Sequence, residues 1–413
     1  MSRLTREALA ERDATDPLAR FRDAFALPDG VIYLDGNSLG PLPKATVARL
    51  DEVARRQWGE DLIRSWNAHD WIGMPGRVGD KIARLIGAGE GEVAVADSTS
   101  INLFKLLAAA LRLRPDRRVI VTEAGNFPTD IYIAQGLVDL LGQGYELRCV
   151  EPEDIAGAID GRAAVAMITH VEYRSGRMHD MAALTAAAHA QGALMLWDLS
   201  HSAGAVPLDL GGCGVDLAVG CGYKYLNGGP GAPAFLYVAR RLHDDVQTPL
   251  WGWMGHAAPF AFDADYRPAA GIARTLCGTP PVLSLAALEA GVDLALEVDM
   301  GALREKSVAL THAFIALVEQ ECREVGFEVL SPRAAARRGS QVALRHADGY
   351  PIVQALIARG VIGDFRAPDV LRFGLAPLYL RHVDVWDAVA SLRDIMQAGA
   401  WDDPQFRRRA AVT

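Results

Sequence analysis

Short apolar runs rich in β-branched residues alternate with segments of helical periodicity between about residues 90 and 240. Strands bounded by turn residues typically give such runs. Between them, helices are predicted at about 101–111, 129–141 and 181–191. Strands that are apolar on both faces and separated by helices indicate a mostly parallel sheet between helices. The seven predicted strands are Val93–Ala96, Val119–Thr122, Tyr145–Val150, Ala163–Thr169, Ala193–Trp197, Leu217–Cys221 and Ala234–Val238.

The pattern changes after this region. Two long helical segments run from about 282 to 323 and separate near 299–301. Beyond them, strands are predicted at Gly326–Leu330, Gln341–Arg345 and Val370–Phe373, with helices at about 351–359 and 383–397. We therefore predict three parts. They are an N-terminal segment (1–40) that packs on the small domain or on a partner, a large α/β domain (41–300) and a small α+β C-terminal domain (301–413).

Composition narrows the class of protein. The chain has 413 residues, half of them hydrophobic, which suits two domains with sizeable cores. The net charge of −9 and the lack of a long basic run argue against nucleic-acid binding. No apolar stretch has the length of a membrane span, and the charged first 22 residues lack the pattern of a signal peptide. We therefore expect no membrane association.

Five scattered cysteines form no CxxC pair, and the ten histidines show no metal-binding spacing. These features favour a reducing, cytoplasmic location with neither a disulfide framework nor a bound metal.

Polar residues follow five of the predicted strands. In open α/β sheets, ligands bind at the carboxyl ends of the strands. Polar loops are also expected there simply because they are solvated, but solvation does not explain which residue types occur. The segments are 97–100, 123–130, 169–170, 198–201 and 223–224.

Lys224 and Asp198 are the most informative pair among these residues. The chain has only five lysines, so it uses arginine wherever a positive charge is enough. Arginine cannot lose its proton and cannot form an imine, whereas lysine can. An acid after a neighbouring strand can keep a pyridine nitrogen protonated. Together the two residues are the minimum needed to hold pyridoxal phosphate, although a surface lysine in a turn is the commoner use of such a position.

Two other strand ends, and a histidine three residues after Asp198, could complete such a site. Thr99 and Ser100 open a helix, whose N-terminus can bind phosphate or can simply be capped by these hydroxyls. Phe127 could stack on a pyridine ring or pack in the core. His201 could contact the cofactor or be a satisfied structural histidine.

Two loops and one strand of the C-terminal half are further candidates. Segments 251–256 and 274–281 are rich in aromatic residues, glycine or proline, and they suggest walls of a site or an interface. Arg372 lies in a strand-like run, where it could bind a carboxylate with two parallel hydrogen bonds or be exposed at a sheet edge.

These motifs together resemble the kynureninase family of fold-type I pyridoxal phosphate enzymes, over nearly the whole chain. The Tyr-Lys-Tyr-Leu-Asn and Gly-Trp-Met-Gly-His motifs are the most specific, because class V relatives such as the desulfurases usually carry histidine before the lysine. Cys221 in place of a serine is a mild departure. The similar blocks are 33–41, 100–103, 127–130, 198–204, 221–227, 252–256, 278–281 and 372–379.

The resemblance implies a role for each matching residue. Lys224 would carry the cofactor, Asp198 would pair with its pyridine nitrogen, and Tyr223 would bind phosphate or move a proton at the substrate ketone. Arg372 and Asn37 would bind substrate, with Arg372 on its carboxylate. The other implied cofactor-binding residues are Thr99, Ser100, Phe127, Pro128, Thr129, Asp130, Thr169 and His201, with Trp253 and Thr279 contributed by the second subunit of a homodimer.

The implied activity is hydrolysis of L-kynurenine, and of 3-hydroxykynurenine as an open possibility, to the anthranilate and L-alanine. This reaction belongs to tryptophan catabolism and NAD biosynthesis. Two alternatives stay open from the sequence. One is another class V reaction on the same scaffold, as in a cysteine desulfurase, selenocysteine lyase or aminotransferase. The other is a pyridoxal phosphate-binding module without catalysis.

Overall fold

The structure is a computed structural model that describes residues 3–409. Residues 1–2 and 410–413, the ends of the predicted segments 1–40 and 301–413, lie outside the described residues. The chain forms two compact units. The large unit comprises Ala45–Glu172 and His179–Leu296, and the small unit comprises Met1–Lys44, Tyr173–Met178 and Glu297–Thr413.

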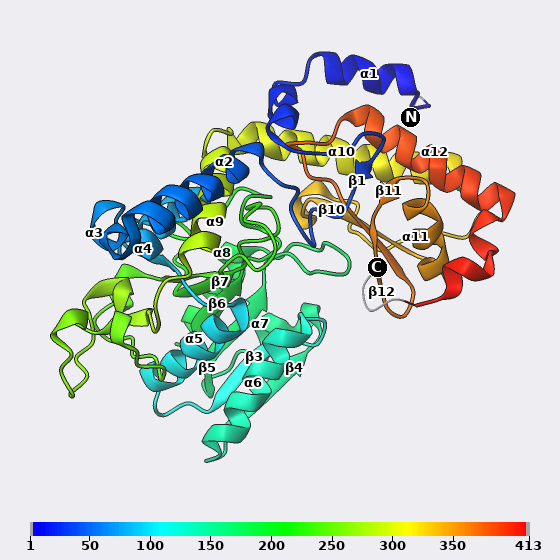
Figure 1. Cartoon of the computed structure of the whole chain (residues 1–413). Helices are drawn as coiled ribbons and strands as arrows, with labels where there is room; N and C mark the ends of the chain where they lie inside the picture. The colour runs from blue at the N-terminus through cyan, green and yellow to red at the C-terminus, as the bar shows by residue number, and fades with distance from the viewer. Residues whose placement is uncertain (1–2, 410–413) are drawn as a thin grey trace. The chain divides into compact units, whose positions relative to one another are not determined.

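A seven-stranded sheet forms the centre of the large unit (Figure 1). All seven predicted strands are present. Only β8 is antiparallel to its two neighbours, while the other adjacent pairs are parallel. The mostly parallel sheet predicted from the sequence is therefore confirmed. In spatial order the strands are β2 (Val93–Val95), β8 (Phe235–Val238), β7 (Leu217–Gly220), β6 (Leu194–Asp198), β5 (Ala163–Thr169), β3 (Val119–Glu123) and β4 (Glu146–Val150).

Both faces of this sheet are buried, except along the partly exposed edge strand β4, because alternate residues of the other strands enter two separate cores. In β6, Met195 and Trp197 enter one core while Leu194 and Leu196 enter the other. This alternation explains the continuous apolar runs in the sequence. Helices α4 (Met74–Ile86), α8 (Met181–Ala190) and α9 (Val282–Leu296) line the first core, and α5 (Thr99–Leu113) and α6 (Pro128–Leu141) line the second.

The region before β2 contains helices that the sequence pattern did not predict. A π-helical segment, Val53–Asp61, lies between α2 (Lys44–Glu52) and α3 (Ser65–Ala68). Short helical pieces of this kind carry little periodicity, which is why they escape detection from sequence. Another short helix, α7 (Ile155–Ala158), lies between β4 and β5.

The small unit is an α+β structure. Its sheet is antiparallel in the order β12 (Asp364–Arg366), β13 (Val370–Gly374), β10 (Gln341–Arg345) and β9 (Glu328–Val329). A separate parallel pair joins β1 (Ile32–Tyr33) to β11 (Val361–Ile362). The unit's helices are α1 (Arg6–Ala14), α10 (Met300–Glu321), α11 (Gly349–Ile357) and α12 (His382–Ala398).

Helix α1 belongs to the small unit because Asp13, near its end, caps α12. The Asp13 carboxylate accepts the backbone N–H groups of His382 and Val383, at 2.6 and 3.0 Å. A carboxylate at a helix N-terminus satisfies free N–H groups and favours the helix dipole.

The segment Tyr173–Met178 joins the small unit, although the predicted division placed it in the large domain. Backbone hydrogen bonds explain this assignment. The N–H of Met178 donates to the carbonyl of Arg337, and the N–H of Gly339 donates to the carbonyl of Gly176.

Candidate active site

Lys224 lies in a tight turn directly after β7. The left-handed backbone of Asn227 (φ 53°) helps to close this turn, and a Cβ at Gly222 would lie 2.5 Å from a neighbouring carbonyl oxygen. The turn places Lys224 Nζ 2.9 Å from His201 Nε2 and 5.8 Å from the centre of the Phe127 ring. Three strand ends, those of β7, β6 and β3, thus meet at one amine.

Asp198 is the last residue of β6 and pairs in register with Thr169, the last residue of β5. Its side chain is buried, and one carboxylate oxygen accepts the N–H of Ser200 at 2.6 Å. Burial raises the pKa of Asp198, while the Ser200 hydrogen bonds and the charge of Lys224 oppose that rise. A cation bound against this carboxylate would stabilise its charged form.

Asp130 is a second buried carboxylate at the same sheet edge. Thr169 Oγ1 lies 3.4 Å from one of its oxygens, whereas the other oxygen, Oδ1, is buried without a hydrogen-bond partner. Burial, followed by the negative charge of Asp198, raises the pKa of Asp130 well above its usual range. Of the two acids, Asp198 is therefore the better placed to hold a charge.

Asn126 is a site residue that the sequence analysis did not single out. Its Nδ2 donates to Thr122 Oγ1 at 3.1 Å, and its Oδ1 accepts both the N–H of Phe127, at 2.7 Å, and the Thr169 hydroxyl. Asn126 thereby fixes the start of the loop that carries Phe127. The signals in the sequence were its place in the polar strand-end segment 123–130 and its position just before the predicted Phe127–Asp130 block.

The N-terminus of α5 follows β2 at the same edge of the sheet. Ser98 is the N-cap, and its hydroxyl accepts the N–H of Ile101 at 3.4 Å. Thr99 and Ser100 are half-buried in the first turn, where backbone N–H groups have no partner within the helix. This end of α5 therefore offers N–H groups and two hydroxyls to an anion.

These residues fit pyridoxal phosphate. The site combines an amine, a buried acid, an aromatic ring beside the amine and a helix N-terminus. The unpartnered Asp130 Oδ1 is a buried polar atom that a ligand would satisfy. Among residues 3–409, no group of three or more histidine, cysteine, aspartate or glutamate side chains is placed to hold a metal ion.

The other predicted cofactor residues lie in different surroundings. Tyr223 is half-buried beside Lys224, and burial, then Cys221 and Asp198, raise the pKa of its phenol. Trp253 and Thr279 are both exposed. Their segments pack against each other, because the N–H of Met254 donates to the Cys277 carbonyl at 3.2 Å.

Arg372 lies on β13 of the small unit, and 2% of its surface is exposed. Its guanidinium forms a two-pronged pair with Asp364, in which Nε lies 2.9 Å from Oδ1 and Nη2 contacts Oδ2. It also donates to Ser38 Oγ at 2.7 Å and to the Tyr173 carbonyl at 2.7 Å. The two-pronged pair fixes the plane of the guanidinium.

A second arginine and a second acid complete this cluster. Arg366 Nη2 lies 2.7 Å from Asp364 Oδ2. Burial, and then the charge of Asp364, raise the pKa of Asp35 to about 7. Burial alone would also raise the pKa of Asp364, but Arg372 and Arg366 hold it below its usual value. Below about pH 7, the guanidinium groups of Arg372 and Arg366 therefore face a single charged carboxylate, that of Asp364.

Asn37 is fully buried in the small unit. Its Nδ2 lies 3.4 Å from Gln341 Oε1, and a Cβ at Gly374 would lie 2.3 Å from Asn37 Oδ1. This close packing makes Asn37 a structural neighbour of β13. Its substrate contact stays a prediction.

Comparison with known proteins identifies the family. Kynureninase from Burkholderia pseudomallei is 57% identical over 414 residues, covering 99% of this chain and 100% of that protein. Kynureninase from Pseudomonas fluorescens is 55% identical with the same coverage. The chain belongs to the kynureninase family. The resemblance inferred from its motifs is thus confirmed, and with it the pyridoxal phosphate cofactor.

Two family models match parts of this kynureninase-family chain. The kynureninase C-terminal domain matches residues 303–392, and the DegT/DnrJ/EryC1/StrS aminotransferase family matches residues 68–216.

Solved structures agree with the fold. The match to a cysteine desulfurase from Thermococcus onnurineus NA1 spans 92% of this chain and 98% of that structure. Its TM-score is 0.77 and the sequences are 18% identical. The match to the C-DES protein spans 90% of this chain and 99% of that structure, in which glycine is covalently linked to the PLP cofactor. Its TM-score is 0.77 and the sequences are 17% identical. These likenesses confirm the predicted fold-type I architecture.

Proposed function

We propose that this chain hydrolyses L-kynurenine to anthranilate and L-alanine. Water supplies the hydroxyl of the new carboxyl group, and the bond between Cβ and Cγ breaks. The observation that carries the proposal is the meeting of Lys224 with Asp198, His201 and Phe127 at one sheet edge, in a chain so similar to proteins named kynureninase.

When bound, pyridoxal phosphate supplies an electron sink next to Cα of the amino acid. Lys224 would hold the cofactor covalently and, once released by the substrate amine, would remove the proton from Cα. His201, 2.9 Å from Lys224 Nζ, is placed to hold that amine in position. Asp198 would keep the pyridine nitrogen protonated, and the N-terminus of α5 would bind the phosphate.

Tyr223 is the proposed proton carrier at the substrate ketone. Its raised pKa keeps the phenol protonated at neutral pH, so that it can donate to an oxygen that gains charge as water adds to Cγ.

The test is to supply the purified protein with pyridoxal phosphate and to follow fluorescent anthranilate from L-kynurenine. Turnover of 3-hydroxykynurenine and sulfide release from L-cysteine are measured in parallel. We expect anthranilate, with alanine in equal amount, and no sulfide. Sulfide without anthranilate would support the desulfurase alternative, and cofactor binding without any turnover would support a non-catalytic module.

The cysteines argue against the desulfurase alternative. A desulfurase needs a reactive thiolate, and thiolates form readily only where the pKa is lowered. Here burial raises the pKa of Cys277, and it raises the pKa of Cys322 to about 11. The desulfurase-like structures share the fold at 19% identity or less, which does not carry their chemistry to this chain.

Arg372 is the proposed anchor of the substrate carboxylate. Arg372→Lys is expected to raise the KM for L-kynurenine about 100-fold with a smaller change in kcat, because a single ammonium cannot keep the two-pronged pair with Asp364 and also bind the substrate carboxylate. Steady-state anthranilate release measures both constants. Arg345→Lys is the matched control, since Arg345 lies on the neighbouring strand β10 and pairs with the exposed Glu328. An unchanged KM in Arg372→Lys would contradict this role.

We also propose a homodimer with a shared site, located in the cytoplasm. No helix within residues 3–409 is long and apolar enough to cross a membrane.

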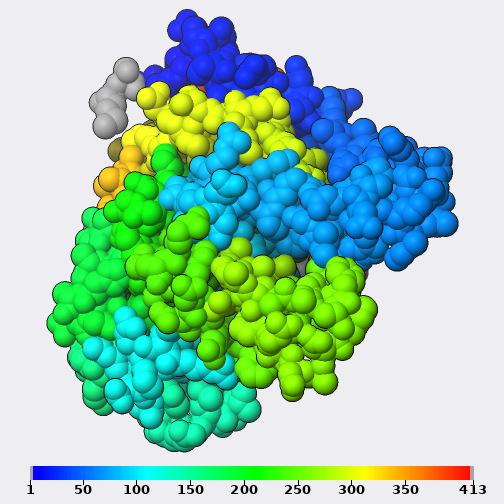
Figure 2. Space-filling model, turned by 90° about the vertical axis from the view of Figure 1, so that its left-hand side faces the viewer, coloured from blue at the N-terminus to red at the C-terminus, as the bar shows by residue number. Residues whose placement is uncertain are grey.

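Large apolar side chains are exposed on the large unit, in segments 53–71 and 251–284. Both segments lie on the face shown in Figure 2. Exposed apolar surface of this kind marks interaction sites. These side chains include Trp58, Ile63, Trp251, Phe260, Phe262 and Leu283.

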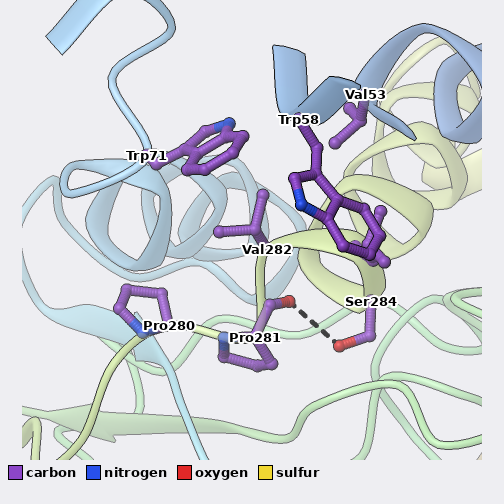
Figure 3. A pocket seen from close by; sticks show the side chains of 8 residues that line it. Val53, Trp58, Trp71, Pro280, Pro281, Val282 and Ser284 are labelled. Atoms are coloured by element: carbon purple, nitrogen blue, oxygen red, sulfur yellow. Dashed lines mark hydrogen bonds between the residues drawn. The ribbon is translucent and has the colours of Figure 1, made fainter. Parts of the chain in front are cut away.

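An apolar pocket of about 450 Å³ lies between these two segments. Figure 3 shows Trp58 and Trp71 on one side and Pro280 and Pro281 on the other. Pro280 directly follows Thr279, the residue predicted to reach the second subunit's phosphate. The position of the pocket beside Thr279 supports the shared site.

The dimer is tested by light scattering, where we expect a mass of twice 44.4 kDa. Phe262→Asp, at a side chain 78% exposed, is expected to shift the equilibrium toward monomer and to weaken cofactor retention, because a carboxylate cannot be buried in an apolar interface at low cost. Leu140→Asp on α6, at a side chain 70% exposed, is the control. A monomeric wild-type protein with full activity would overturn the shared site.

A further inference from the structure

Lys105 is a fully buried lysine of the large unit, and the proposed mechanism leaves it without a role. It lies in the second turn of α5 with none of its surface exposed. Its Nζ lies 2.5 Å from Asp97 Oδ2, 2.8 Å from the Thr275 carbonyl and 3.3 Å from Asn102 Oδ1. A single ammonium group thus binds three acceptors from two distant parts of the chain.

Asp97 places a negative charge beside the helix end that would bind phosphate. It follows β2, has a left-handed backbone (φ 50°), and precedes Ser98, Thr99 and Ser100. Its side chain is 30% exposed. An unpaired carboxylate here would repel a phosphate dianion at this helix end. The Lys105 ammonium cancels that charge.

Thr275 connects Lys105 to the loop that carries Thr279. Thr275 is fully buried, and its hydroxyl donates to the Ile272 carbonyl at 2.7 Å. Two residues later, the Cys277 carbonyl accepts the N–H of Met254. Lys105 therefore links the start of α5 to both loops predicted to contribute to a phosphate site.

We propose that Lys105 is a positioning residue for phosphate binding. It neutralises Asp97 and holds the Thr275 segment against the start of α5, so that this helix end keeps a net attraction for an anion. The proposal rests on the proposed cofactor site but not on the reaction catalysed there. A purely structural ion pair would instead affect stability without any preference for phosphate.

The test compares apoenzyme affinity for pyridoxal phosphate with affinity for pyridoxal, which lacks the phosphate, by equilibrium titration. Lys105→Met is expected to weaken pyridoxal phosphate binding at least about tenfold while changing pyridoxal binding about threefold or less. The double variant Asp97→Asn/Lys105→Met is expected to recover most of the loss, because the repelling charge is gone. Equal weakening for both ligands, or no recovery in the double variant, would overturn the proposal.

Asp97→Asn alone keeps the test decisive if Lys105→Met does not fold. Removing the acid leaves the ammonium uncompensated until phosphate binds, so pyridoxal phosphate is expected to bind more tightly than to the wild type while pyridoxal binding stays unchanged. Weaker pyridoxal phosphate binding in this variant would contradict the inference. A wild-type protein that binds no pyridoxal phosphate would instead refute the proposed function itself.

Discussion

Lys224→Ala is expected to lower kcat for L-kynurenine by about 10⁴-fold or more, because the variant loses both the covalent attachment of the cofactor and the base at Cα. If the cofactor still binds to this variant, dialysis should remove it and the yellow colour should disappear. Anthranilate release and the visible spectrum before and after dialysis measure the two effects.

A labelling experiment separates Lys224 from the other lysines. Borohydride reduction of the wild-type holoenzyme, followed by peptide mass mapping, should place the cofactor on Lys224. Lys44→Ala, at an exposed position at the start of α2, should keep full activity and label. Label on Lys105 or Lys81, or turnover in Lys224→Ala close to that of the wild type, would refute the assignment.

Asp198→Asn is expected to lower kcat by about 10³-fold, because a neutral amide cannot hold the proton on a pyridine nitrogen, and the ring then withdraws electrons less strongly. Steady-state anthranilate release measures this. Asp130→Asn is the matched comparison at the same sheet edge. Since burial and the charge of Asp198 raise the pKa of Asp130 well above its usual range and so favour its neutral form, its replacement by a neutral amide should cost about tenfold or less.

The ranking of these two acids is the decisive result. If Asp130→Asn were the more damaging change, Asp130 would be the charged partner of the ring, and the assignment made from the strand-end position of Asp198 would be wrong. Retention of more than a tenth of wild-type kcat by Asp198→Asn would remove Asp198 from the catalytic group altogether.

Much of the large unit was predictable from sequence because the strands of its sheet, apart from the partly exposed edge strand β4, are buried on both faces. Burial on both faces gives continuous apolar runs, and the polar residues that follow each run mark the carboxyl edge of the sheet. This reasoning found β2 to β8 and placed Lys224, Asp198 and Thr169 at strand ends. It failed for α2 and α3 and the π-helical segment between them, where short or irregular helices leave no sustained period.

Several features of the site depend on contacts between residues far apart in the chain. Asn126 was missed because its importance comes from accepting the Thr169 hydroxyl, 43 residues away. The ion pair between Asp364 and Arg372 depends on the antiparallel pairing of β12 with β13, and β12 is only three residues long. A strand that short has no pattern of its own to recognise.

By itself, the sequence determined the family, the positions of the strands along the chain and the chemical groups at their ends, because local periodicity and specific motifs encode these directly. Only the tertiary structure decided which of those groups lie close enough to interact electrostatically or by hydrogen bonds. It paired Asp130 with Asp198, joined Lys105 to Asp97 and Thr275, and gave Arg372 a fixed partner. The physical reason is that charge and hydrogen bonding act over a few ångströms in space, and spacing along the chain does not specify which side chains come that close.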